Sequence, residues 1–290
     1  MTFSIAVKHN QYSTYILTDD TTLSRLEVVP ERGGIITRWS IQGQDLLYLD
    51  EERFANPELS IRGGVPILFP ICGNLPNNTY SYNDKTYTLK QHGFARDLPW
   101  NVLEQRTDSC AQLILVLTSN EQTLKSYPFE FQLKFTYELD GKNLRIHQEY
   151  SNLSEEVMPF SFGFHPYFLA QDKTKLELDI PSSSYQVQQT KEVFPYQGGF
   201  DFTNDEIDVG FQSLTRSSAS MIDRQRGFKI TLNWSDSYST FVFWTVKGKD
   251  YVCLEPWSAP RNAITTGEQL TQLEPGATCE AMVDMTVESL

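Results

Sequence analysis

Hydrophobic and polar residues alternate along much of this chain. In the segment 131–139, FQLKFTYEL, every second side chain is apolar and the side chains between them are polar. The segments 228–234 (FKITLNW) and 175–180 (KLELDI) repeat this pattern. Because successive side chains of a β-strand point to opposite faces, the alternation predicts strands that have one buried and one solvated face.

Short turn sequences separate several of these runs. Asp140 and Gly141 lie between FTYEL and NLRIHQEY, and both residue types tolerate a positive φ, which predicts a β-hairpin at this point. The segments 246–250 (VKGKD) and 82–85 (YNDK) predict two further hairpins in the same way. Most of the strands are therefore expected to pair with their neighbours in sequence.

Helical periodicity is rare in this chain. The segment 119–127, SNEQTLKSY, predicts one short helix with Ser119 or Asn120 as its N-cap, and the segment 56–60, NPELS, predicts a turn. Many short strands with few helices are typical of antiparallel sheets packed face to face. We therefore expect an all-β fold, a large antiparallel β-sandwich. No linker or change of composition divides the chain, so residues 1–290 are expected to form one domain.

Charge and composition limit the classes of partner. The net charge is -13 and the isoelectric point is about 4.8. Nucleic acids and anionic membranes are bound by concentrated positive surfaces, so neither is an expected partner. A neutral small molecule fits this charge, whereas an anionic one would need a local group of arginines.

The sequence also predicts a cellular compartment. The first residues, MTFSIAVKHNQYSTY, lack the pattern of a secretory signal, and no apolar run reaches the length that spans a membrane. The four cysteines are far apart and form no C-x-x-C pair, which favours free thiols in a reducing environment. We therefore expect a cytoplasmic protein. The cysteines are Cys72, Cys110, Cys253 and Cys279.

Four segments depart from the strand pattern. Each combines Gly or Pro with aromatic residues and one or two ionisable side chains, a mixture that suits a rigid wall around a ligand. The segments are SIRGGVPILFPICGNLP with Arg62, QHGFARDLPW with His92 and Arg96, SFGFHPYF with His165, and CLEPWSAPRNAI with Glu255.

Taken singly, these ionisable residues have ordinary structural explanations. His165 could be a core histidine with both nitrogens bonded to the backbone, and Glu255 could belong to a surface ion pair. Taken together, a carboxylate and an imidazole in apolar surroundings would each be unfavourable without a partner. If they share one cavity, they form a pair for general acid–base catalysis, and burial should raise the pKa of Glu255.

Other chemistries find less support in the sequence. His92, His165 and Glu255 could form a two-histidine, one-carboxylate metal site, but no H-x-H or H-E-x-x-H spacing accompanies them. No G-x-S-x-G elbow and no phosphate-binding glycine loop occurs. We expect neither a metal nor a cofactor.

At these four segments the chain resembles the aldose 1-epimerase, or galactose mutarotase-like, family, and in particular the branch that includes hexose-6-phosphate 1-epimerases. The motifs that carry the resemblance are RGGVPILFP, QHGFARDLPW, SFGFHPYF and LEPWSAPRNAI, which together lie between residues 62 and 264. The resemblance implies one large antiparallel sandwich with a sugar bound on a concave sheet. It also implies that α and β anomers of an aldohexose or a hexose 6-phosphate are interconverted.

The resemblance further implies roles for individual residues. Glu255 corresponds to the base that takes the proton of the anomeric hydroxyl, and His165 to the acid that protonates the ring oxygen. His92 and Arg62 occupy the places of sugar-contacting residues near the reacting atoms. An aspartate that binds sugar hydroxyls is expected in NDEIDVGFQSL, where Asp208 is the candidate, with Asp201 and Asp205 nearby.

The nature of the sugar stays open at this level. Arg62 and Arg96 resemble the basic side chains that hold a 6-phosphate, whereas FHPYF resembles the branch for unphosphorylated sugars. A non-catalytic carbohydrate-binding or sugar-sensing protein is the alternative, although binding alone needs no acid–base pair. A glycoside hydrolase would normally require a second carboxylate beside the scissile bond.

Overall fold

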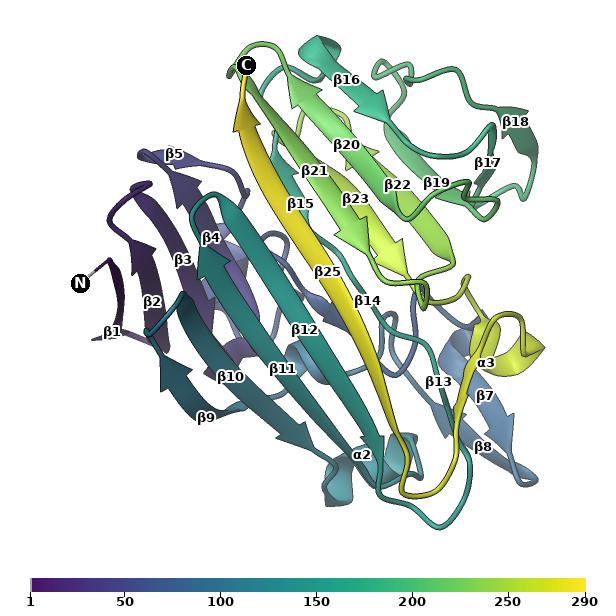
Figure 1. Ribbon diagram of the computed structural model, residues 1–290. Coiled ribbons are helices and arrows are strands. Elements are labelled where there is room, and N and C mark those ends of the chain that lie inside the picture. The colour runs from purple at the N-terminus through teal and green to yellow at the C-terminus, as the bar shows by residue number, and fades with distance from the viewer. Residues whose placement is uncertain (1) are drawn as a thin grey trace.

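The structure is a computed structural model that describes residues 2–290. Its largest sheet has eight antiparallel strands in the order β16-β20-β21-β25-β12-β11-β10-β9. Several of these long strands run side by side in Figure 1. Their bounds are β9 Asn101–Arg106, β10 Ala111–Thr118, β11 Phe131–Asp140, β12 Asn143–Asn152, β16 Leu176–Asp179, β20 Ser218–Asp223, β21 Phe228–Trp234 and β25 Thr278–Ser289.

A second antiparallel sheet carries the residues of chemical interest. Its strands follow the order β18-β17-β19-β22-β23-β14-β6, and β15 also pairs with β23. The bounds are β6 Ile67–Leu68, β14 Gly163–Phe164, β15 Tyr167–Leu169, β17 Ser184–Val187, β18 Val193–Pro195, β19 Glu206–Phe211, β22 Thr240–Val246 and β23 Tyr251–Trp257.

Smaller elements complete the architecture. The N-terminal strands form a five-stranded sheet beside the long strands, drawn in purple in Figure 1. These strands are β1 Phe3–His9, β2 Ser13–Asp19, β3 Ser24–Val29, β4 Ile35–Ile41 and β5 Gln44–Asp45. Two-stranded pairs are formed by β7 Thr79–Tyr82 with β8 Lys85–Thr88, and by β13 Met158–Phe160 with β24 Thr271–Leu273.

Helices are few and short in the described residues. The α-helices are α1 Glu51–Ala55, α2 Glu121–Ser126 and α3 Ala263–Thr266, and the 3-10 helices are η1 Pro30–Arg32, η2 Pro76–Asn78, η3 Ala95–Asp97 and η4 Lys173–Lys175. The predicted helix at 119–127 is α2, and its N-cap is Asn120, whose side chain accepts hydrogen bonds from two backbone N–H groups. Within residues 2–290 no helix has the length and apolar character needed to cross a membrane.

The alternating segments form strands as predicted. Strand β11 buries every second side chain over its first nine residues, and β21 does the same over its whole length. The hairpin at 140–141 forms with one adjustment, because Asp140 still pairs with Asn143, so that Gly141 and Lys142 make the two-residue loop. Gly141 has a φ of 60°, which a glycine adopts without strain.

The hydrophobic core lies between the two large sheets. The ring centres of Trp234 on β21 and Phe241 on β22 are 5.1 Å apart, and those of Phe135 on β11 and Phe164 on β14 are 6.0 Å apart. These contacts join the inner faces of opposite sheets, as in a β-sandwich. The prediction of a large antiparallel all-β sandwich is therefore confirmed.

Candidate active site

Three neighbouring strands of the second sheet form the floor of the candidate site. Across the sheet, Asp208 on β19 pairs with Trp244 on β22, and Trp244 pairs with Cys253 on β23. Val242 pairs with Glu255. Because alternate residues of a strand point to the same face, Asp208, Trp244 and Glu255 lie on one side of this sheet.

Loops and short strands that are distant in sequence form the walls. The backbone N–H of His165 donates to the Pro66 carbonyl over 3.1 Å, which joins the segments of the first and third motifs. Gly93 has a φ of 70°, and a Cβ placed on it would lie 2.2 Å from the Phe69 carbonyl oxygen. Only glycine fits so close to this carbonyl oxygen. The close contact holds the loop that contains His92 against the strand that follows Arg62.

The six residues predicted as site residues line one cavity of about 220 Å³. This volume is below the roughly 300–1,000 Å³ that is usual for drug-sized ligands, so a single small ring is the appropriate occupant. Asp208 lines this cavity, whereas Asp205 is fully exposed in its side chain. The predicted residues are Arg62, His92, Arg96, His165, Asp208 and Glu255.

Sequence reasoning missed part of the wall. Glu206 and Trp244 also line the cavity, and the Trp244 indole donates to Glu206 over 2.7 Å. Arg261 lies in the same wall. Glu206 and Trp244 each lie two residues away, on their own strand, from another residue that faces the cavity. Their position in the wall could therefore be predicted only from the register of the strands.

Glu255 and His165 form a buried pair at the base of the cavity. The Nε2 atom of His165 lies 3.3 Å from Oε1 of Glu255, and their side chains are 9% and 1% exposed. The other carboxylate oxygen, Oε2, accepts a hydrogen bond from the Trp257 indole over 3.1 Å. One oxygen is thus fixed by the tryptophan, and the imidazole reaches the other, which leaves the pair positioned for proton transfer.

Burial shifts both pKa values toward the neutral forms. Burial raises the pKa of Glu255 well above its usual range, and the nearby charge of Asp208 raises it further. Burial lowers the pKa of His165 well below its usual range, and so do the charges of Arg96 and Arg62. The expected rise for Glu255 is confirmed in direction. Perturbed ionisable groups of this kind are typical of catalytic sites.

His92 presents a hydrogen-bond donor to the same cavity. The backbone N–H of Gly73 donates to its Nδ1 over 3.1 Å, so that a neutral imidazole carries its proton on Nε2. Burial lowers the pKa of His92 well below its usual range, which favours this neutral form. The centres of the His92 and His165 rings are 5.5 Å apart. His92 can therefore donate to an oxygen atom of a ligand held at His165.

Two arginines in the wall lack acidic partners. In the part of the chain that the structure describes, neither Arg62 nor Arg96 makes an ion pair. Arg62 lies over the Trp244 ring at 5.1 Å, and Arg96 donates to the Gln91 carbonyl over 2.8 Å while its Nε stays unpartnered. Unpaired guanidinium groups at a cavity wall are suited to binding an anion.

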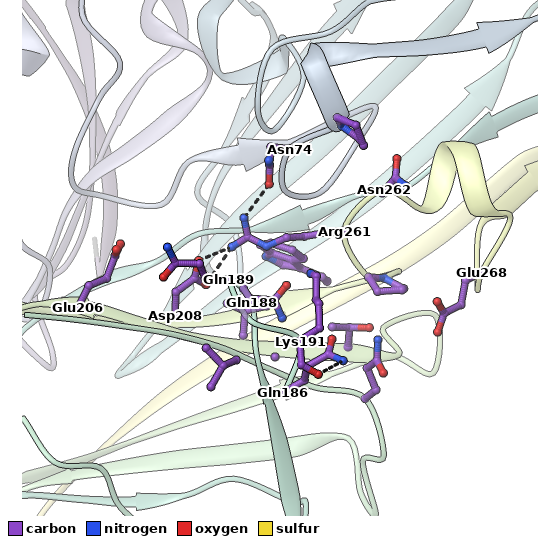
Figure 2. Close-up of a pocket in the computed structure, with 18 residues that line it drawn as sticks. Asn74, Gln186, Gln188, Gln189, Lys191, Glu206, Asp208, Arg261, Asn262 and Glu268 are labelled. Carbon is purple, nitrogen blue, oxygen red and sulfur yellow. Dashed lines mark hydrogen bonds and ion pairs between the residues drawn. The ribbon is translucent and has the colours of Figure 1, made fainter. Parts of the chain in front are cut away.

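Asp208 and Arg261 form an ion pair in the wall of the cavity. One terminal nitrogen of Arg261 lies 2.9 Å from each oxygen of Asp208, and the other donates to the Asn74 side chain over 2.9 Å. Figure 2 shows Arg261 between these two partners. Burial raises the pKa of Asp208, although Arg261 opposes that rise.

The structure brings together a different set of possible metal ligands from the set that the sequence suggested. The ligand atoms that come within 4.8 Å of one another belong to His165, Cys253 and Glu255, so that Cys253 stands where His92 had been considered. Burial and the charge of Glu255 raise the pKa of the Cys253 thiol well above its usual range. The thiolate is the form that binds a metal, so an ion held by these three residues would have to displace the thiol proton.

The raised pKa of Glu255 predicts a pH-dependent gain in stability for Glu255→Gln. The folded protein keeps this proton after the unfolded chain has released it, so the contribution of Glu255 to the free energy of unfolding is complete below pH 4.5 and is lost as the pH rises toward the folded pKa. The Glu255→Gln variant has no carboxyl group at this position, so its free energy of unfolding does not fall in this way. Its stability relative to the parent should grow by about 1.4 kcal/mol per pH unit in that window.

Urea denaturation of both proteins at several pH values between 4.5 and 7 measures this difference. A difference that stays constant over this range would show that the carboxyl is already ionised when buried.

Comparisons with known proteins place the fold and the motifs in context. The model of the family described as aldose 1-epimerase matches residues 16–286. The LacX protein of Lactococcus lactis subsp. lactis is 27% identical, and the match covers 88% of this chain and 94% of that protein. A protein of Cenchrus ciliaris, named as a candidate glucose-6-phosphate 1-epimerase, is 28% identical over 80% of this chain and 67% of its own length.

Solved structures show the same architecture. The Slr1438 protein of Synechocystis sp. PCC 6803 is 50% identical, with a TM-score of 0.94 and 96% of each chain covered. Galactose 1-epimerase from Lactobacillus acidophilus NCFM is 16% identical, with a TM-score of 0.77 and 99% of this chain and 98% of that chain covered. At this identity the second likeness concerns the fold alone.

Proposed function

The chain belongs to the aldose 1-epimerase family, whose members are isomerases, and from this premise we propose that Glu255 and His165 interconvert the α and β anomers of an aldose by acid–base opening and closing of the ring. The observation that carries the proposal is the buried pair, 3.3 Å apart, at the base of a cavity that suits one small ring. We also propose that residues 1–290 act as one catalytic domain, since one hydrophobic cluster includes residues from Leu17 to Val287.

The proposed reaction moves two protons in concert. The step starts from the ion-pair form, in which the one proton of the pair lies on His165 and not on Glu255, where burial favours it in the free protein. Glu255, as the carboxylate, takes the proton of the anomeric hydroxyl, and the electron pair left on that oxygen forms the carbonyl at C1. The bond between C1 and the ring oxygen breaks, and the ring oxygen takes the proton of the His165 imidazolium. The pair holds one proton before and after this step.

Ring closure repeats these transfers in reverse. The aldehyde rotates about the bond between C1 and C2, and the hydroxyl at C5 then attacks the other face of the carbonyl. His165 recovers a proton from this hydroxyl, and Glu255 returns one to the carbonyl oxygen. His92, through Nε2–H, is placed to donate to an oxygen near these atoms, and Asp208 to accept from the sugar hydroxyls. The enzyme ends in the state in which it began.

We further propose that the sugar carries a phosphate group. Arg62 and Arg96 line the cavity without acidic partners among residues 2–290, where Nε of Arg96 also lacks a hydrogen-bond partner. Guanidinium groups match phosphate oxygens in geometry and charge. A phosphorylated hexose would supply the anion that these side chains lack, in spite of the net negative charge of the protein.

The direct test is anomer equilibration. Purified protein is mixed with freshly dissolved α-glucose, α-galactose or glucose 6-phosphate, and optical rotation or the anomeric NMR signals are followed. Faster equilibration than in buffer supports the proposed isomerisation. Sugar-induced stabilisation of the protein without any acceleration would contradict it and indicate a carbohydrate-binding protein instead.

Arg96→Gln should distinguish phosphorylated from plain sugars. Loss of one charge-assisted hydrogen bond removes about 1.5–3 kcal/mol of binding, so the KM for glucose 6-phosphate should rise roughly ten- to 150-fold. The KM for glucose should change little. Arg145→Gln, on β12 of the other large sheet, is the matched control and should leave both values unchanged. Equal effects of Arg96→Gln on both sugars would argue against a phosphate at this position.

A further inference from the structure

Cys253 is a buried thiol beside the catalytic pair, and the proposed reaction gives it no role. Its side chain is fully buried. Cys253 and Glu255 are two residues apart on β23, so their side chains point to the same face of the sheet. The Sγ atom of Cys253, a carboxylate oxygen of Glu255 and a ring nitrogen of His165 all lie within 4.8 Å of one another. A thiol, a carboxylate and an imidazole thus meet at one point.

Strand pairing determines where these three residues meet. Strand β14 pairs with β23 at Trp257, and β15 pairs with β23 at Cys253. His165 lies in the gap between β14 and β15, midway between these two pairs, so the register places it opposite Glu255. The backbone of the sheet therefore sets the positions of all three residues.

The distances between the three groups suit a small tetrahedral ion. Bonds of about 2.0–2.3 Å to nitrogen, oxygen and sulfur place any two ligands of a tetrahedral zinc ion about 3.3–3.8 Å apart. Nε2 of His165 and Oε1 of Glu255 are 3.3 Å apart, which already fits. The Sγ atom of Cys253 lies within 4.8 Å of both groups and would need to move by roughly 1 Å at most.

The charges of the three groups balance the charge of a divalent ion. A thiolate and a carboxylate together carry two negative charges, and burial lowers the pKa of His165, which keeps the imidazole neutral. A Zn²⁺ ion bound to all three groups would form a unit without net charge, which a buried position tolerates better than an unpaired ion. Thiolate and imidazole ligands also favour zinc over magnesium and calcium, which prefer oxygen.

We propose that His165, Cys253 and Glu255 form a binding site for one Zn²⁺ ion, and that the bound ion inhibits the protein. On binding, the thiol proton and the one proton of the Glu255–His165 pair pass to water. The cavity that His165 and Glu255 line leaves room for a water molecule at the fourth ligand position. Inhibition follows because the ion occupies the atoms that take and give protons, and this part of the inference rests on the proposed function.

A cadmium titration tests the site without any assay of activity. In the triple variant Cys72→Ser/Cys110→Ser/Cys279→Ser, Cys253 is the only thiol of the chain. Cd²⁺ binds the same kinds of ligand as Zn²⁺, and its bond to a thiolate gives an ultraviolet charge-transfer band. We expect this band to reach its maximum at one ion per chain. Absence of the band, or a band that does not saturate at one ion, would overturn the inference.

Calorimetry of Zn²⁺ binding compares the two most buried thiols. Cys253→Ser removes the sulfur ligand and should weaken zinc binding by at least about 100-fold, since changes outside the ligand shell already cost roughly 10–100-fold. Cys72→Ser is the matched control, because Cys72 is also buried but is not one of the three ligand residues. All proteins in this comparison carry Cys110→Ser and Cys279→Ser, which removes the partly exposed thiols. Equal affinities with and without the Cys253 thiol would overturn the inference.

Inhibition is measured with a sugar that the parent protein equilibrates. Zn²⁺ should slow the equilibration and EDTA should restore it, and each protein is compared with its own metal-free rate. Because the ion and the sugar compete for Glu255 and His165, the apparent KM should rise with zinc while kcat stays the same. Zinc binding that leaves the rate unchanged would overturn the inference and leave the proposed function intact. A parent protein that equilibrates no sugar would overturn the proposed function, while the cadmium band would still decide the site.

Discussion

Glu255→Gln is expected to lower the rate of anomer equilibration by about 10²–10⁴-fold, the usual contribution of one proton-transfer group. The amide has the shape of the carboxylate and can still accept the hydrogen bond of the Trp257 indole, which is 3.1 Å long in the parent protein. It cannot take a proton from the anomeric hydroxyl. The loss should therefore appear in kcat, with little change in KM.

Glu206→Gln is the matched control for this variant. Glu206 lines the same cavity and accepts a hydrogen bond from the Trp244 indole over 2.7 Å, so the same substitution is made in a similar setting. It should retain most of the parent rate, because in residues 2–290 the ion pair of His165 is with Glu255, and Glu206 is bonded to Trp244 instead. Rates are measured by polarimetry, and thermal unfolding confirms that both variants are folded. A Glu255→Gln protein with a near-normal rate would remove Glu255 from the mechanism.

His165→Asn should cause a loss of similar size, because protonation of the ring oxygen is the other half of the same step. The control is His147→Asn. His147 lies 3.6 Å from Glu138 on the other large sheet, a distance close to the 3.3 Å between His165 and Glu255, but its side chain is 47% exposed. The exposed pair resembles the catalytic pair in distance alone, so its disruption should leave the rate unchanged.

The double variant Glu255→Gln/His165→Asn gives a sharper readout. Groups that act as one unit are not additive, so the double variant should be hardly slower than the slower single variant. If the two losses multiplied, the residues would act independently and the concerted transfer would be wrong. If His165→Asn kept most of its activity, another group would have to be the acid.

The sequence predicted the half-buried strands well and the fully buried ones poorly. Strand β11 alternates because one face meets the core and the other meets solvent. All seven residues of β23 are buried, and so are the first six of β22. Both faces of these strands therefore carry apolar side chains, or polar side chains that have a buried partner. Periodicity therefore could not show which side of these strands faces the cavity, and Glu255 was identified by its motif.

Short helices without buried residues were also outside the reach of the pattern. The helix α1 has no buried side chain, and its start is fixed by Asp50, whose carboxylate accepts from the Arg53 backbone. A helix that buries nothing has no reason to show an apolar stripe. The helix α3 follows Asn262, which has a φ of 65°, and its four residues are too few for a periodic signal.

The site residues were predictable by type and motif, but their mutual arrangement was not. Three aspartates competed for the position beside the sugar, and only strand pairing placed Asp208 opposite Trp244 and in the cavity. The bridge from Asn74 through Arg261 to Asp208 joins residues 53 and 187 positions apart in sequence. Nothing in the local sequence around any of the three indicates such a contact.

The position of β25 has a consequence for the synthesis of the protein. This strand, Thr278–Ser289, pairs with β12 on one side and with β21 on the other, so it joins two halves of the largest sheet. The β9–β12 and β20–β21 segments are translated before residues 278–289. Because synthesis proceeds at about 5–20 residues per second, the edges of β12 and β21 that will bind β25 stay unpaired in the nascent chain for several seconds. During that interval these edges are where chaperones should bind and where aggregation should begin.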